Sequence, residues 1–141
     1  MSRDQDIVIP LVHLGELRLY RDRQQPEKLW LLFRWPTAGS EKGYHHVSLT
    51  FCADDIPRLI TTIDEAVKTR EPRSYKTYTD HLVEFHPDRH PDDKKYEGAV
   101  EGRLWMGFHN LRRVTHESRQ ARRACLIGDE ISRLIDELRQ I

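Results

Sequence analysis

The sequence has only two cysteines, Cys52 and Cys125, and no long apolar run. Disulfide-stabilised secreted domains carry many more cysteines, and neither residue has the spacing of a zinc site, so we interpret both as reduced packing residues. A membrane-spanning helix needs about 20 consecutive apolar residues. The charged start MSRDQDIVIP also lacks the apolar stretch of a signal peptide. We therefore expect a cytoplasmic or nucleoid-associated protein with no membrane partner.

An excess of either charge is also missing, because 23 Lys and Arg residues balance 23 Asp and Glu residues. The overall charge therefore predicts neither a nucleic-acid partner nor an acidic membrane. The distribution of charge is uneven, however. Arginines gather between residues 101 and 127, whereas segments 54–71 and 128–141 are acidic. This pattern predicts a basic sheet surface backed by acidic helices.

Motifs of common enzyme classes are lacking as well: no GxSxG, P-loop or GxGxxG sequence occurs. His86 and His90 have an H-x3-H spacing, but a proline follows each and disfavours the helix that would place both on one face. The segment PDRHPDDKKYE is similar to a PD…(D/E)xK nuclease signature, yet it crowds Asp88, Asp93 and Lys95 into one polar loop. We expect no enzymatic activity, no metal and no cofactor.

What the sequence does contain is an internal repeat. Shifted by 75 residues, LWLLFRW (29–35) lies over LWMGFHN (104–110), and DDIPRLITTIDEA (54–66) lies over DEISRLIDELRQI (129–141). The identical pairs are Leu29/Leu104, Trp30/Trp105, Phe33/Phe108, Asp54/Asp129, Ile56/Ile131, Arg58/Arg133, Leu59/Leu134 and Ile60/Ile135. These pairs fall on one strand and one helix face, which favours duplication. Two strand-then-helix units that share residues by composition alone are the alternative.

Each half is predicted to contain β-strands followed by one amphipathic helix. Apolar residues recur at helical spacing over 56–67 and 131–141, after Asp54 or Asp55 in the first half and Asp129 in the second as N-caps. The expected strands are 12–21, 28–35, 44–52, 80–86, 102–110 and 119–127, with a fourth strand per half if 7–12 or 72–79 pairs. The predicted fold class is α+β, with antiparallel sheets that carry helices on one face. One domain, 1–141, would hold a first repeat at 7–71 and a second at 72–141.

Strand alternation, read together with the repeat, assigns side chains to the two faces of each sheet. Leu29, Leu31 and Phe33 are assigned to the core, because their counterparts at 104, 106 and 108 are also apolar. Trp35 is interpreted as a packing residue at the strand end. On the neighbouring strand 44–52, His46, Ser48 and Thr50 are expected to point outward.

The opposite face of each sheet is expected to stay open and to combine flat rings with basic side chains. The predicted binding residues are Arg18, Tyr20, Trp30, Arg34, Trp105, His109, Arg112, Arg113, Arg119 and Arg123. Rings of this kind stack on bases, at about 1–3 kcal/mol per base, and the cations attract phosphates. The alternative is that Trp30 and Trp105 pack at an interface. The chain would then be a protein-interaction or oligomerisation module, such as a regulatory adaptor.

With two β-rich units that each end in a helix, and the passage VSLTF…DDIPRLITTIDEAV from strand to helix, the sequence resembles the PUR-repeat proteins. More broadly it resembles the superfamily that these share with the plant Whirly proteins. The resemblance implies four-stranded sheets, each followed by a helix, and single-stranded nucleic acid on aromatic and basic strand residues. It also implies a homodimer as an assembly to test. We therefore expect a non-enzymatic binder of single-stranded DNA or RNA with little sequence specificity.

Overall fold

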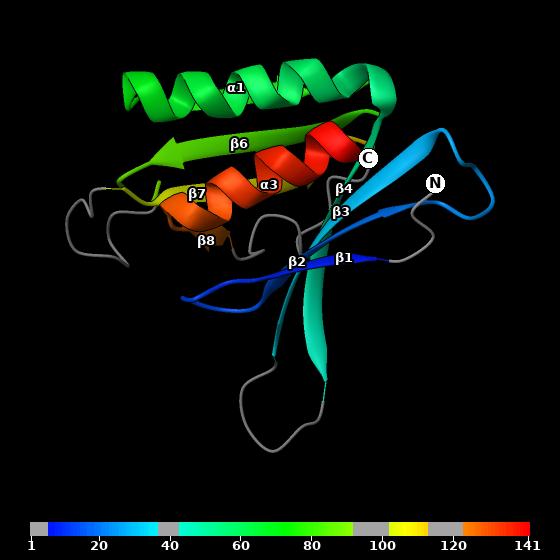
Figure 1. The fold of residues 1–141 in the computed structure, drawn as a ribbon, viewed down its shortest axis with the longest axis horizontal. Coiled ribbons are helices and arrows are strands. Elements are labelled where there is room, and N and C mark those ends of the chain that lie inside the picture. The colour runs from blue at the N-terminus through cyan, green and yellow to red at the C-terminus, as the bar shows by residue number, and fades with distance from the viewer. Residues whose placement is uncertain (1–5, 37–42, 92–101, 113–122) are drawn as a thin grey trace.

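The chain folds into two four-stranded antiparallel sheets, each followed by a helix (Figure 1). The structure is a computed structural model and describes residues 6–36, 43–91, 102–112 and 123–141. The first sheet contains, in chain order, β1 (Ile7–Pro10), β2 (Glu16–Arg21), β3 (Lys28–Pro36) and β4 (Tyr44–Cys52). A 3₁₀ turn (Ala53–Asp55) leads into α1 (Ile56–Thr69). The second sheet contains β5 (Arg73–Lys76), β6 (His81–Pro87), β7 (Leu104–Asn110) and β8 (Ala124–Leu126), and α3 (Gly128–Gln140) follows. The predicted α+β class is confirmed.

Each half does contain a fourth strand: β1 in the first half pairs with β2, and β5 in the second half pairs with β6. The predicted strand 12–21 begins later, at Glu16, because Gly15 lies in the turn with a φ of +75°. A Cβ at Gly15 would come within 2.2 Å of the Arg34 carbonyl oxygen. Only glycine therefore fits where this turn approaches β3. Of the predicted strand 119–127, Ala124–Leu126 is observed, and 119–122 lies outside the described residues.

The core contains the apolar faces of both sheets and both helices as one cluster. Leu29, Leu31 and Phe33 are at most 3% exposed, which confirms their predicted assignment to the core. Trp35 is also buried, and its ring lies 5.0 Å from that of Phe33 between centroids. Its interpretation as a packing residue at the strand end is therefore confirmed.

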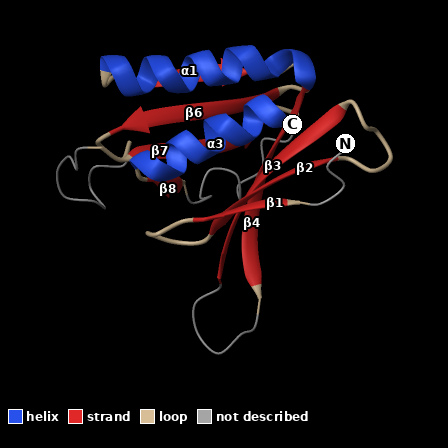
Figure 2. Cartoon of the chain, in the orientation of Figure 1, coloured by secondary structure: helices blue, strands red, loops and turns tan. Residues whose placement is uncertain are grey.

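Each helix contacts the other repeat as well as following its own sheet. The helix α1 runs along β5 and β6, and α3 contacts both β1 and α1, so the two helices lie next to each other (Figure 2). Two hydrogen bonds tie α3 and the C-terminal residue to the first sheet: Arg133 donates to the Val8 carbonyl oxygen at 3.0 Å, and Arg21 donates to the Ile141 carbonyl oxygen at 2.8 Å. The two repeats are interlocked by these contacts. No helix in the described residues is long and apolar enough to cross a membrane.

A carboxylate holds the start of each helix to the end of the preceding strand. Asp55 accepts a hydrogen bond from the Cys52 backbone N–H at 2.9 Å, and Glu130 accepts one from the Ile127 N–H at 2.9 Å. The predicted N-cap Asp129 is therefore wrong, since the α3 cap position is Ile127 and the carboxylate that bonds its N–H is one residue beyond Asp129. From that position the Glu130 side chain reaches back to the backbone N–H of Ile127, the residue before the helix.

The same two carboxylates extend into the opposite repeat. Asp55 accepts hydrogen bonds from the Tyr75 hydroxyl at 2.6 Å and from the Tyr78 N–H at 3.2 Å. Glu130 accepts one from the Val12 N–H at 2.8 Å. Val12 and Tyr78 occupy corresponding places, in the turns β1–β2 and β5–β6. Each helix start therefore anchors the first hairpin of the other repeat.

Candidate nucleic-acid interface

Two parallel aromatic rings lie on the open face of the first sheet. Tyr20 and Trp30 face each other across β2 and β3, with ring centroids 6.2 Å apart and ring planes 3° apart. The indole N–H of Trp30 donates to Asp22 at 3.1 Å, and the Lys28 ammonium lies 4.8 Å from the Trp30 ring centroid. Both rings are partly exposed. The pair therefore forms a flat surface with a fixed orientation and an adjacent cation.

Two predicted arginines on this face share one carboxylate. Glu16 accepts from Arg18 Nε at 2.7 Å and from an Arg34 terminal nitrogen at 3.0 Å. Burial opposes the charged form of Glu16, but these hydrogen bonds outweigh it and lower the pKa of Glu16. The Arg34 guanidinium also lies 4.1 Å from the Tyr44 ring centroid. The pairing reduces the positive charge of the face and holds both guanidinium groups in place.

The open face of the second sheet has a carboxylate at its centre. Three nitrogen atoms lie close to Oε2 of Glu84: His86 Nε2 and an Arg123 terminal nitrogen, each hydrogen-bonded at 3.4 Å, and His109 Nε2 at 3.3 Å. The His109 and His86 side chains beside it hold the pKa of Glu84 well below its usual range. Glu84 is therefore ionised at neutral pH, and it compensates the cations around it.

Gly107 allows Arg123 to reach this cluster. Gly107 is the cross-strand partner of Glu84, and a Cβ on it would lie 3.0 Å from Arg123 Nε. Trp105 lies on the same strand, across from His86 and edge-on to the His90 ring at 4.7 Å between centroids. The second face thus combines an indole, two imidazoles, a guanidinium and a carboxylate.

The predicted binding residues fall into two groups, because each sheet has its own open face. Arg18, Tyr20, Trp30 and Arg34 lie together on the first sheet, and Trp105, His109 and Arg123 lie together on the second. Arg112 follows β7, is exposed, and pairs with Asp80 at 3.0 Å. Arg113 and Arg119 lie outside the described residues.

The sequence prediction missed the acidic members of both faces and one histidine. Glu16 and Arg18 are two residues apart on β2, as are Glu84 and His86 on β6, so strand periodicity alone places each pair on one face. A carboxylate neither attracts a phosphate nor stacks on a base, so the pattern expected of a nucleic-acid-binding face does not point to these acidic residues. Glu16 orients Arg18 and Arg34, and Glu84 orients Arg123, through these hydrogen bonds.

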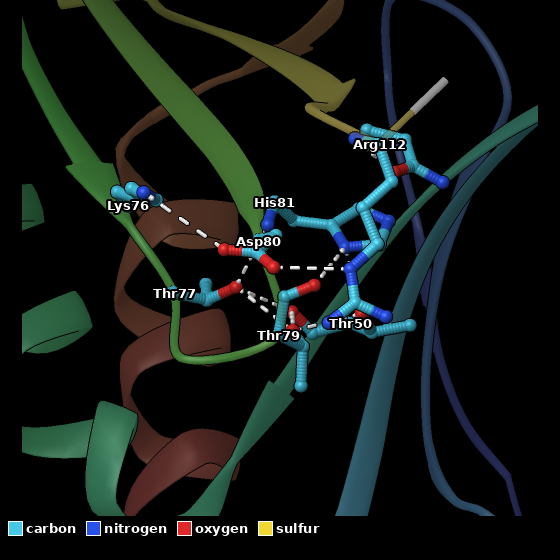
Figure 3. A network of polar contacts seen from close by, with 8 residues as sticks. Thr50, Lys76, Thr77, Thr79, Asp80, His81 and Arg112 are labelled. Carbon is cyan, nitrogen blue, oxygen red and sulfur yellow. Dashed lines mark hydrogen bonds and ion pairs between the residues drawn. The ribbon is translucent and has the colours of Figure 1, made fainter.

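The prediction that Thr50 points outward into solvent is wrong, because this residue is only 2% exposed. Its hydroxyl lies 2.8 Å from His81 Nδ1 and donates to Thr79 Oγ1 at 2.8 Å (Figure 3). The Thr77 hydroxyl donates to the Thr50 carbonyl oxygen at 2.9 Å. Burial is the main reason that the pKa of His81 is lowered. The β5–β6 turn of the second repeat therefore covers this end of the first open face.

Among the described residues, no group of three or more His, Cys, Asp or Glu side chains is arranged to hold a metal ion. Cys52 and Cys125 are both free thiols. Burial raises the pKa of Cys125 to about 11, so this thiol stays protonated at neutral pH.

A scan against protein-family models, a search of curated proteins and a search of solved structures gave no match to this chain.

Proposed function

We propose that the chain binds single-stranded DNA or RNA, with the open face of the first sheet as the main contact surface. The observation that carries the proposal is the parallel Tyr20–Trp30 pair with Lys28 at its edge. Partly exposed rings offer a stacking surface to any base, which suits binding with little sequence preference. Arg18 and Arg34 border the rings and can meet phosphates. Cytoplasmic or nucleoid location and a homodimer belong to the same proposal.

The charge pairing sets the expected strength of binding. Because Glu16 already accepts from both arginines, a phosphate has to compete with it, and only part of the positive charge acts on the strand. We expect a dissociation constant of about 1–100 µM that weakens as salt increases. This is the range of non-specific electrostatic binding supplemented by a small number of stacked bases.

The test is fluorescence anisotropy with a labelled single-stranded oligonucleotide at two salt concentrations. Trp30→Ala should weaken binding about 5-fold to 150-fold, since stacking is worth about 1–3 kcal/mol per base. Val12→Ala is the control, because this side chain is 72% exposed and lies in the β1–β2 turn next to the start of α3. Affinity weaker than about 100 µM for the native chain, or binding without salt dependence, would contradict the proposal.

A protein-interaction module is the second candidate, and the carboxylates favour it. Glu16 and Glu84 reduce the positive potential that a phosphate backbone would meet. If the open faces pack on another copy of the chain, Trp30→Ala should lower the mass measured by light scattering after size-exclusion chromatography. Oligonucleotide should then leave the intrinsic tryptophan fluorescence unchanged.

A further inference from the structure

The cluster on the second open face has a chemistry that goes beyond binding. We propose that Glu84, His86, His109 and Arg123 form a site that cleaves single-stranded RNA by transesterification. The inference rests on the proposed function, because the strand must first lie on the open sheet faces. It departs from the expectation that the chain has no enzymatic activity, which was based on linear motifs alone.

The geometry supplies two imidazoles that face the same small area. Nε2 of His86 and Nε2 of His109 lie 3.4 and 3.3 Å from one oxygen of Glu84, so the two rings are within about twice a hydrogen-bond length of each other. Their side chains are 20% and 30% exposed, which leaves part of each ring open to solvent. When Nε2–H is donated to a carboxylate, Nδ1 remains to exchange a proton with a substrate.

RNA carries its own nucleophile next to each phosphorus, the 2′-hydroxyl, so an acid and a base are the only reactive groups that the protein must supply. The neutral imidazole accepts the 2′-hydroxyl proton while the bond from O2′ to phosphorus forms. The bond from phosphorus to O5′ breaks, and the other ring, as imidazolium, gives its proton to O5′. The products are a 2′,3′-cyclic phosphate and a 5′-hydroxyl, and solvent restores the two protonation states.

The remaining residues stabilise and orient the reaction. Arg123 places a guanidinium beside the two rings, where it can stabilise the charge that develops on the phosphoryl oxygens. Glu84 is a positioning residue whose Oε2 lies close to Nε2 of both rings. Trp105 lies across from His86 and is a surface for a neighbouring base. At the first sheet, Tyr20 and Arg34 occupy the places of the two histidines, so this chemistry is confined to the second sheet.

The experiment uses the full chain and a quenched fluorescent DNA oligonucleotide that contains a single internal uridine, at about pH 6.5 with excess EDTA. We expect scission only at the uridine, with a cyclic phosphate product. The all-DNA oligonucleotide and the 2′-O-methyluridine analogue should stay intact. His86→Gln and His109→Gln should each slow scission by at least about 100-fold, the usual contribution of a general acid or base. His13→Gln is the matched control, because this histidine is exposed in the β1–β2 turn, and it should change the rate less than about twofold.

Anisotropy with the all-DNA oligonucleotide, measured on the same samples, separates the two proposals. Binding without scission of the uridine substrate overturns the nuclease site and leaves the proposed function standing. Absence of binding both to this oligonucleotide and to a 2′-O-methyl RNA oligonucleotide overturns both. Scission that persists at the native rate in folded His86→Gln and His109→Gln shows a contaminating nuclease and overturns the inference. If a variant does not fold, cleavage of the 2′-O-methyl analogue by the native chain also overturns the inference, because a transesterification cannot cleave it.

Discussion

The substitution Asp55→Asn tests the interlocking of the two repeats. Asp55 is fully buried, and its two oxygens accept from the Cys52 N–H, the Tyr75 hydroxyl and the Tyr78 N–H. The Asn side chain keeps its shape and one oxygen, but its amide group then faces donors instead of accepting from them. Hydrogen bonds to a charged group contribute about 1.5–3 kcal/mol each. With one oxygen lost, we expect the free energy of unfolding to fall by about 3 kcal/mol.

The measurement is urea unfolding followed by circular dichroism, with Asp54→Asn as the matched control. Asp54 is the preceding residue and is exposed, so its substitution should change the free energy of unfolding by less than about 0.5 kcal/mol. A double-mutant cycle with Tyr75→Phe should give a coupling of at least about 1 kcal/mol, since these two side chains are 2.6 Å apart. Equal stability of Asp55→Asn and Asp54→Asn would refute the interlock as a stabilising contact.

Three further predictions concern the fold. Gly15→Ala should lower the free energy of unfolding by at least about 2 kcal/mol, because its φ is +75° and its Cβ would meet a backbone carbonyl of β3. Gly43→Ala, whose Cβ would meet nothing within 4 Å, should be tolerated in the same urea assay. The pKa of His81 is lowered in the folded state, so the unfolded chain binds more protons as pH falls through about 6.5. Stability should therefore decline on acidification below that pH, and His81→Gln should flatten the decline. A thiol reagent should modify Cys52 before Cys125, as mass spectrometry of a time course can show, because Cys125 is buried and its pKa is about 11. Modification of Cys125 first would contradict this order.

Sequence periodicity predicted the parts of the fold that depend on local pattern. Alternation over 29–35 gave the buried set, and the repeat at 104–110 decided which of the two faces was the core. Gly128 and Asp129 indicated the start of α3. The carboxylate that bonds the Ile127 N–H belongs to Glu130 and not to Asp129, because the longer side chain one residue further on reaches back to this donor. Two adjacent acidic residues in a sequence do not reveal which of them makes this bond.

The errors at the candidate site come from contacts distant in sequence. Thr50 lies on the open side of β4 by alternation, but the turn that buries it is formed by Thr77 and Thr79 of the other repeat. Likewise, the sequence places Glu84 and His86 on one face of β6, whereas their proximity to the residues of β7 depends on strand register. Register follows from how two strands pair, and no single segment specifies it.

The two open faces differ although their frameworks match. Tryptophan is kept at 30 and 105, yet its cross-strand neighbour is Tyr20 in the first sheet and His86 in the second. Leu32 of the first sheet corresponds to Gly107, where the missing side chain gives Arg123 a path to the central carboxylate. A ring pair that stacks with fixed geometry suits holding a strand, whereas partly exposed imidazoles around a carboxylate suit proton exchange. The proposed binding face and the proposed cleavage site therefore differ at corresponding strand positions, while the interlocked helices keep both sheets in one core.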